Sequence, residues 1–155
     1  MRLLKSILVP VGTLLAFPLA LCAQQANPVA SGAAQGLEGT WRGEMSCAKL
    51  SFTRGPQKVP IEVVVSANKA TFARRVWNQD NSAVVGTEEG GGEVGTGGAI
   101  KLSSEWRATD ANPRHAFNAS YTGSLQGNVG SLKGMQAWKF DGKIENRGCS
   151  ISLKR

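Results

Sequence analysis

The sequence predicts an all-β protein, a single eight-stranded antiparallel up-and-down barrel closed by one disulfide. Three observations carry this prediction: short segments alternate between apolar and polar residues, clusters of turn-forming residues separate them, and one cysteine stands near each end of the domain. Alternation with a period of two residues gives a strand one buried and one solvated face. No segment shows a convincing amphipathic helical pattern.

The first expected strand is 39–47, in which Trp41, Gly43, Met45 and Cys47 share the apolar face. Seven further strands are expected at 59–67, 70–77, 84 onward into a glycine-rich stretch (88–98), 99–108, 115–125, 131–140 and within 143–154. Turn-forming residues occupy 66–69, 79–82, 110–113, 127–130 and 141–142. Eight short strands at this spacing are typical of a β-sandwich or an up-and-down barrel.

Residues 1–23 are expected to be a signal peptide. Arg2 and Lys5 supply the basic start, and 7–21 is mostly apolar but too short and too interrupted by proline to span a membrane. The small residue Ala23 fits a cleavage site. Signal removal lowers the formal net charge from +7 to +5, and the remaining positive charges are spread along the chain, so no nucleic-acid partner is expected.

The segment after the signal, 24–36, is small, polar and without periodicity, and is expected to be a flexible spacer before the barrel domain (37–155). The predicted location is the bacterial periplasm or the exterior, with no transmembrane segment once the signal is cleaved. An alternative is lipoprotein processing at Cys22. The sequence predicts no oligomeric state.

Export leaves two cysteines in an oxidising compartment, so Cys47 and Cys149 are expected to form a disulfide. Both lie on the apolar faces of the terminal strands. A disulfide requires α-carbons about 5.5 Å apart. The first and last strands are therefore expected to be neighbours, which closes the sheet and favours the barrel over the sandwich. An eight-stranded barrel has room inside for side chains or one small ligand.

The motif Gly39-Thr40-Trp41 is similar to the G-x-W opening of the calycin group, which includes lipocalins, avidin-like barrels and bacterial metalloprotease inhibitors. The resemblance implies that the tryptophan closes one end of the barrel. It also implies that a basic residue near the end of the chain, Arg147 or Arg155, packs on the tryptophan ring by a cation–π contact.

The opening pattern GxWxGxxxC, with a cysteine near the C-terminus, also looks like that of small uncharacterised exported bacterial barrel domains, which imply no activity. Bacterial metalloprotease inhibitors are similar in size, signal, disulfide and barrel. They imply that the mature N-terminus enters a protease cleft. The spacer is the segment that would play this part, so a protein–protein interaction module or inhibitor of an envelope or secreted enzyme is the alternative function.

Five residues are candidates for lining a ligand cavity because their parity places them inside the barrel: Trp41, Trp106, Tyr121, Gln136 and Trp138. Buried polar groups need hydrogen-bond partners. Tyr121 and Gln136 either bond to each other and to water within the core or line a cavity for a ligand. The favoured function is therefore an exported, non-enzymatic protein that binds a small ligand or an envelope component.

No motif in the chain indicates catalysis, a metal or a cofactor. The glycine-rich stretch contains a formal G-x-G-x-x-G, but no helix follows it, so we expect a hairpin tip or kinked strand edge instead of a dinucleotide site. His115 is the one histidine and is expected at the barrel mouth. An unmarked carboxylate pair such as Glu88 and Glu105 stays open as a catalytic alternative.

Overall fold

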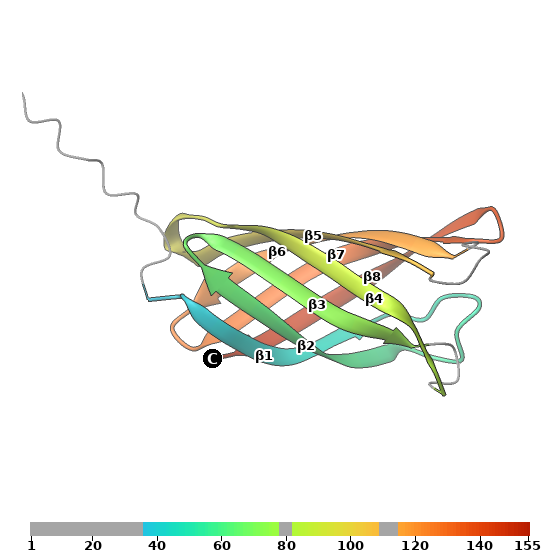
Figure 1. The fold of residues 1–155 in the computed structure, drawn as a ribbon, viewed down its shortest axis with the longest axis horizontal. Helices are drawn as coiled ribbons and strands as arrows, with labels where there is room; N and C mark the ends of the chain where they lie inside the picture. Colours follow the sequence, from blue (N-terminus) through green and yellow to red (C-terminus); the bar gives the residue numbers. More distant parts are fainter. Residues whose placement is uncertain (1–35, 78–81, 109–114) are drawn as a thin grey trace, which may run out of the picture.

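The computed structural model describes residues 36–77, 82–108 and 115–155. Within these ranges the chain forms a closed antiparallel barrel in which each strand pairs with its neighbours in sequence and the last strand pairs with the first (Figure 1). The strands are β1 (Gly39–Cys47), β2 (Gln57–Ser66), β3 (Lys69–Trp77), β4 (Val84–Val94), β5 (Ala99–Arg107), β6 (Ala116–Gln126), β7 (Val129–Phe140) and β8 (Lys143–Lys154). The predicted fold class is confirmed.

Several predicted segments lie outside the described residues. These are the signal peptide, all of the spacer except Gly36, most of the turn at 79–82 and all of the turn at 110–113. Within the described ranges, no helix has the length and apolar character needed to cross a membrane.

Two tight hairpins connect the strands at opposite ends of the barrel. Ala67 and Asn68 have φ values of 46° and 67°, and Asp141 and Gly142 have φ values of 46° and 79°. Two positive φ angles at the centre of a two-residue loop match the right-handed twist of the flanking strands. The turns predicted at 66–69 and 141–142 are therefore present.

The glycine-rich stretch was expected to be a hairpin tip or a kinked strand edge, and this holds only for its end, the turn between β4 and β5. Most of it belongs to β4, which pairs with β3 on one side and β5 on the other. A Cβ atom on Gly90 would lie 2.3 Å from the Phe72 ring and 2.7 Å from Ser104 Cβ. The missing side chain therefore makes room for its neighbours inside a narrow barrel. The turn itself comes later, at the 3₁₀ segment η1 (Thr96–Gly98).

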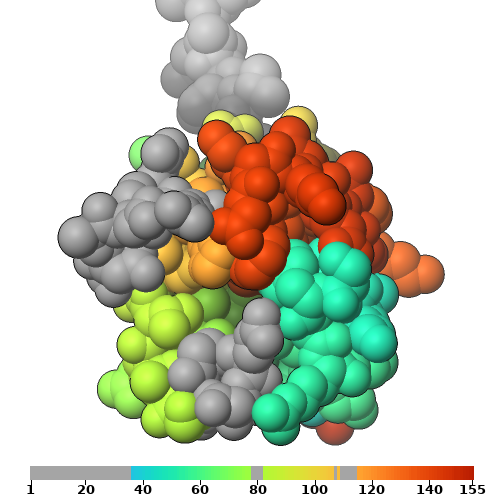
Figure 2. Space-filling view, turned by 90° about the vertical axis from the view of Figure 1, so that its right-hand side faces the viewer, coloured from blue at the N-terminus to red at the C-terminus, as the bar shows by residue number. Residues whose placement is uncertain are grey.

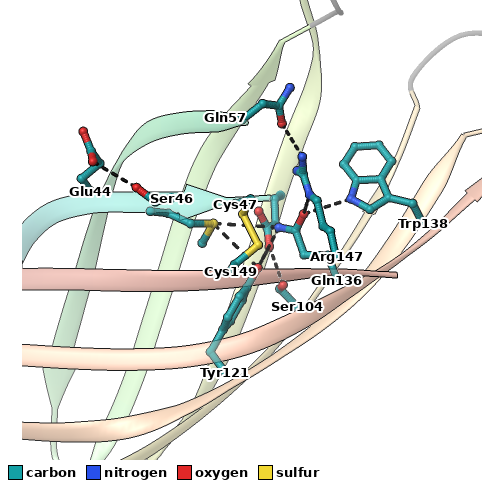
Figure 3. The surroundings of a disulfide bond; sticks show 12 residues. Glu44, Ser46, Cys47, Gln57, Ser104, Tyr121, Gln136, Trp138, Arg147 and Cys149 are labelled. Atoms are coloured by element: carbon teal, nitrogen blue, oxygen red, sulfur yellow. Dashed lines mark hydrogen bonds between the residues drawn. A yellow bond between two sulfur atoms is a disulfide. The ribbon is translucent and has the colours of Figure 1, made fainter. Parts of the chain in front are cut away.

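The predicted disulfide joins β1 to β8 (Figure 3). Cys47 and Cys149 are direct partners in the register of these two strands, and their α-carbons are 4.1 Å apart. Both cysteines are buried. The covalent bond therefore reinforces the strand pair at which the sheet closes on itself.

One end of the barrel, where β1 begins and β8 ends, is closed by Trp41. This side chain is fully buried, and its Nε1 donates a hydrogen bond to the carbonyl of Leu37 at 2.9 Å. The guanidinium of Arg155 lies 5.3 Å from the centre of the Trp41 ring. The backbone N–H of Arg155 donates a hydrogen bond to the carbonyl of Asn128. The basic residue that covers the tryptophan is therefore Arg155, whereas Arg147 lies elsewhere.

Candidate functional site

The character of the barrel interior changes along its axis. The half nearest Trp41 is apolar, with buried side chains that include Val63, Val65, Ala70, Phe72, Val94, Ile100, Leu102, Leu125, Leu132, Ile151 and Leu153. A ring of polar side chains follows, which we call the polar belt: Arg74, Glu88, Ser104, Tyr121, Gln136 and Arg147. Aromatic rings fill the far end, which we call the mouth.

Three aromatic residues occupy one row of paired backbone positions across the wall of the mouth, and their rings all contact one another, with the Trp106 and Trp138 centres 5.5 Å apart. Trp106 on β5 pairs in register with Phe117 on β6, which in turn pairs with Trp138 on β7. The centres of the Phe117 and Trp138 rings are 4.5 Å apart, and those of Trp106 and Phe117 are 5.6 Å apart. Strand alternation puts all three inside, and the register makes each the direct partner of the next.

A second group of rings stacks above this row. Phe52, in the connection between β1 and β2, lies parallel to Phe140 with ring centres 4.4 Å apart, and His115 stacks on Phe140 at 4.3 Å. The connection is held in place by Glu145, whose carboxylate accepts hydrogen bonds from the backbone N–H and the hydroxyl of Ser51. The mouth therefore has aromatic walls supplied by several separate parts of the chain.

These side chains surround a cavity of about 190 Å³, which we call the mouth cavity. Its lining residues are Phe52, Thr53, Gln57, Val76, Trp77, Val85, Trp106, Ala108, His115, Trp138 and Phe140. Figure 2 looks onto this end, with the β1–β2 connection in teal, β4 in light green and the β7–β8 hairpin in red. The lining is largely apolar, with a few polar groups from Thr53, Gln57 and His115.

Trp106 is packed against β4. It is 4% exposed, and its Nε1 has no hydrogen-bond partner among the described residues. A Cβ atom on Gly86 would lie 2.3 Å from this nitrogen. Glycine at position 86 therefore lets the indole lie flat against the strand and keeps the mouth cavity clear.

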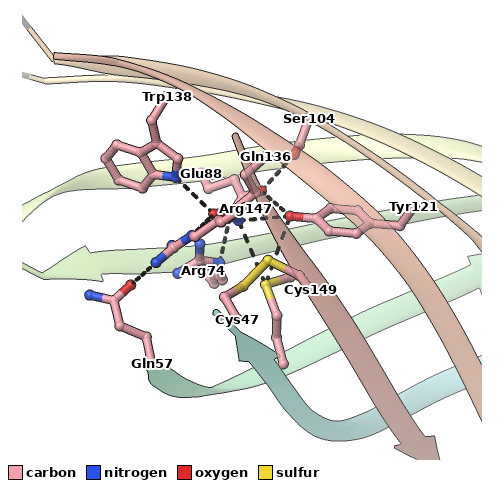
Figure 4. A network of polar contacts seen from close by, with 11 residues as sticks. Cys47, Gln57, Arg74, Glu88, Ser104, Tyr121, Gln136, Trp138, Arg147 and Cys149 are labelled. Carbon is pink, nitrogen blue, oxygen red and sulfur yellow. Dashed lines mark hydrogen bonds and ion pairs between the residues drawn. A yellow bond between two sulfur atoms is a disulfide. The ribbon is translucent and has the colours of Figure 1, made fainter. Parts of the chain in front are cut away.

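The polar belt contains an ion pair that is shielded from solvent (Figure 4). Arg74 on β3 and Glu88 on β4 are direct cross-strand partners, and their side chains form a salt bridge although they are only 7% and 0% exposed. Ser104 Oγ donates a hydrogen bond to Glu88 Oε1 at 2.5 Å, and Tyr121 Oη donates to the same oxygen at 3.4 Å. One oxygen of the buried carboxylate is therefore paired with a positive charge, and the other accepts hydrogen bonds.

Gln136 links the polar belt to the aromatic row. Its Oε1 accepts hydrogen bonds from Trp138 Nε1 at 2.9 Å and from Arg147 Nε at 2.7 Å, and its Nε2 donates to Tyr121 Oη at 2.8 Å. Arg147 also donates through Nη1 to Gln57 Oε1 at 2.7 Å. These bonds fix the orientation of the Trp138 indole, which forms part of the wall of the mouth cavity.

Arg147 carries a positive charge into the interior. It is 3% exposed, and its guanidinium lies 5.1 Å from the centre of the Trp138 ring. Burial, with a smaller contribution from the charge of Arg74, lowers the pKa of Arg147 to about 10. The residue therefore stays charged at neutral pH, but its charge is disfavoured by its surroundings.

Comparison of the chain with known protein families, with curated proteins and with solved structures finds no match.

Of the five predicted lining residues, Trp106 and Trp138 line the mouth cavity. Trp41 lies at the closed end, on the far side of the apolar core. Tyr121 and Gln136 are fully buried in the polar belt and form a hydrogen bond with each other. Of the two arrangements expected for them, the structure therefore shows the hydrogen-bonded network within the core.

The burial of the charged members of the polar belt was not predicted, although strand parity would have pointed to it for Arg74 and Arg147. Arg74 alternates in phase with buried Val76, and Arg147 alternates in phase with Cys149. The open alternative of a Glu88–Glu105 pair is excluded by the register. Glu105 pairs with Glu89, so it faces outward while Glu88 faces the interior. Within the described ranges, no group of three His, Cys, Asp or Glu side chains is arranged to hold a metal.

The ionisation of Tyr121 provides a direct test of the polar belt. It is the one tyrosine in the chain, so phenolate absorbance reports on this residue alone. Burial raises its pKa well above the ordinary value, and the negative charge of Glu88 raises it further. We expect no phenolate signal from the folded protein at about pH 10.5, where most of a free tyrosine is ionised.

In denaturant the same titration should centre near pH 10. Because the pKa is raised in the folded state, the contribution of Tyr121 to stability is complete below about pH 10 and falls at higher pH, where only the unfolded chain ionises. Tyr121→Phe should remove the absorbance change in both states. A native titration midpoint near 10 would contradict the buried position.

Proposed function

We propose that this protein is an exported, non-enzymatic binding barrel that takes a small, flat and largely apolar ligand in the mouth cavity. The observation that carries the proposal is the cavity itself, whose walls are mostly aromatic and are supported from below by the polar belt. Ligand sites are typically apolar concavities with a few polar groups that orient the ligand. Thr53, Gln57 and His115 are the polar groups in this position.

The size of the cavity limits the ligand. A cavity of about 150 Å³ in another protein is large enough to bind benzene. The mouth cavity, at about 190 Å³, therefore suits a molecule of one or two rings. Flat rings would stack on the indole and phenyl groups that face the cavity, because aromatic pairs prefer offset-stacked or edge-to-face arrangements.

Export is supported by the predicted signal peptide and by the disulfide, because disulfides persist in oxidising compartments. The calycin-like resemblance is consistent with a binding role. The alternative role as an inhibitor depends on the spacer, and 24–35 lie outside the described residues. No observation within the described residues favours it.

The proposal is tested by titrating the protein with 2-naphthol, a neutral two-ring probe, in a calorimeter. We expect binding with a dissociation constant between about 10 µM and 1 mM, as for a well-buried ligand of this size. Ala108→Trp adds an indole to the cavity lining and should abolish binding. Ile144→Trp adds the same group on the exposed outer face near the mouth and should leave binding unchanged.

Melting curves of both variants would show whether each remains folded. The ligand proposal would be abandoned if 2-naphthol failed to bind, or if the Ala108 and Ile144 variants bound it equally well.

A further inference from the structure

The barrel wall parts between β2 and β3 near the mouth. These strands pair only over Val63–Ser66 and Lys69–Phe72, although β2 begins at Gln57 and β3 continues to Trp77. Each strand keeps its other neighbour along this length, since Gln57 still pairs with Cys47 and Trp77 with Val84. The separation therefore leaves a lateral opening between β2 and β3.

A pocket of about 130 Å³ lies at this opening, and we call it the side pocket. Its lining residues are Pro56, Gln57, Lys58, Val59, Arg74, Val76, Trp77, Trp138 and Arg147. Gln57, Val76, Trp77 and Trp138 also line the mouth cavity, so the two spaces adjoin. One ligand is therefore able to occupy both.

The side pocket is strongly biased toward positive charge. Its lining contains three cationic residues and no carboxylate. Arg74 is balanced by Glu88, and Lys58 is paired with Glu44 on the exposed face at 3.4 Å. Arg147 has no carboxylate within ion-pair distance among the described residues.

Some hydrogen-bond donors in the side pocket also lack an acceptor among the described residues. Arg147 bonds to Gln136 and Gln57 through Nε and Nη1, and its Nη2 has no acceptor among the described residues. The Gln57 amide accepts from Arg147 through Oε1, which leaves its NH₂ group available to donate. Guanidinium and amide N–H groups are both donors that a carboxylate accepts.

We propose that the side pocket is a carboxylate subsite, in which Arg147 and Gln57 hold the anionic group of a ligand whose rings lie in the mouth cavity. The inference rests on the proposed function, since it assigns the ligand class of the same site as aromatic or other flat apolar carboxylates.

The energetic setting of Arg147 agrees with this assignment. Its charge is disfavoured by burial and by Arg74, and Glu88 is the carboxylate that acts in the opposite direction. Glu88 is already engaged by Arg74. A bound carboxylate would neutralise the remaining charge in a place where water screens it poorly, and charge-assisted hydrogen bonds are among the strongest available to a protein.

The test compares 2-naphthoate with 2-naphthol at pH 7 by calorimetry, because the two probes share a ring system and differ in charge. We expect 2-naphthoate to bind the unaltered protein about 10- to 100-fold more tightly. Arg147→Met should remove this difference, so that the two probes bind the variant with affinities within about threefold of each other. Lys143→Met, which removes an exposed cation from the same strand, should preserve the difference.

The outcomes separate the two proposals. Equal affinities of the unaltered protein for both probes would overturn the carboxylate subsite alone, whereas failure of 2-naphthol to bind would overturn the mouth cavity as the ligand site. Equal losses in the Arg147 and Lys143 variants would also overturn the subsite, because they would indicate a diffuse charge effect.

The comparison of the two probes in the unaltered protein tests the subsite without any substitution. This test therefore remains valid even if Arg147→Met does not fold. Arg147→Lys is the milder variant. It keeps the positive charge but loses the planar donor pair, and we expect it to lower the ratio of the 2-naphthoate affinity to the 2-naphthol affinity several-fold. Unchanged binding of 2-naphthoate to a folded Arg147→Lys protein would contradict the role of the guanidinium.

Discussion

Replacing Glu88 with leucine is expected to lower the free energy of unfolding by about 3–5 kcal/mol. The substitution leaves the Arg74 guanidinium inside the barrel without its counter-ion, with only 7% of that side chain exposed. Ser104 and Tyr121 lose an acceptor at the same time. Removing one member of a buried pair is costly because the other charge stays desolvated and uncompensated.

A double-mutant cycle with Arg74→Met isolates the ion pair from the rest of the belt. Replacing both residues removes both buried charges, so the double variant should be more stable than Glu88→Leu alone. Urea unfolding of the four proteins measures the coupling. Glu89→Leu, at the adjacent outward-facing position of β4, is the matched control and should cost under about 1 kcal/mol. Similar costs at positions 88 and 89 would contradict a buried salt bridge.

Reduction of the disulfide is expected to lower the free energy of unfolding by about 2–5 kcal/mol. The bond closes a loop of 102 residues, and loop-closure entropy for a loop of about 100 residues amounts to roughly 4–5 kcal/mol. It also ties together β1 and β8, the pair on which closure of the barrel depends. The melting midpoint should fall by roughly 5–20 °C for a domain of this size.

Melting curves with and without reductant, on the chain lacking 1–23, measure this effect. A Cys47→Ala, Cys149→Ala double variant should melt at the lower temperature in both conditions, which controls for effects of the reductant itself. Thiol titration of the unfolded, unreduced protein should find no free sulfhydryl group. Two free thiols, or a melting midpoint that does not respond to reductant, would contradict the expected role of the bond.

The sequence by itself determined the strands, their inward faces and the disulfide. Period-two alternation decides which side of a strand a residue occupies, and the alternating residues of β5 show this with buried Leu102 and Trp106. Positive-φ turn residues such as Asn68 and Gly142 decide where the chain reverses. Such local rules depend only on neighbours in sequence, so they can be read before the fold is known.

The same rules do not determine the height of an inward residue along the barrel axis. Trp41 and Trp138 both face the interior, but one seals the closed end and the other lines the mouth cavity. Height depends on the stagger between strands, which only the closed barrel sets. The prediction of five lining residues therefore combined side chains from three different levels of the interior.

The features of the candidate site that only the tertiary structure decided are the polar belt and the side pocket. Arg74 and Glu88 become partners through the β3–β4 register, and Arg147 reaches Gln57 across 90 residues of sequence. The opening between β2 and β3 arises because their pairing ends early. The physical reason is that cross-strand contacts depend on register and closure, which belong to the whole sheet and to no single segment.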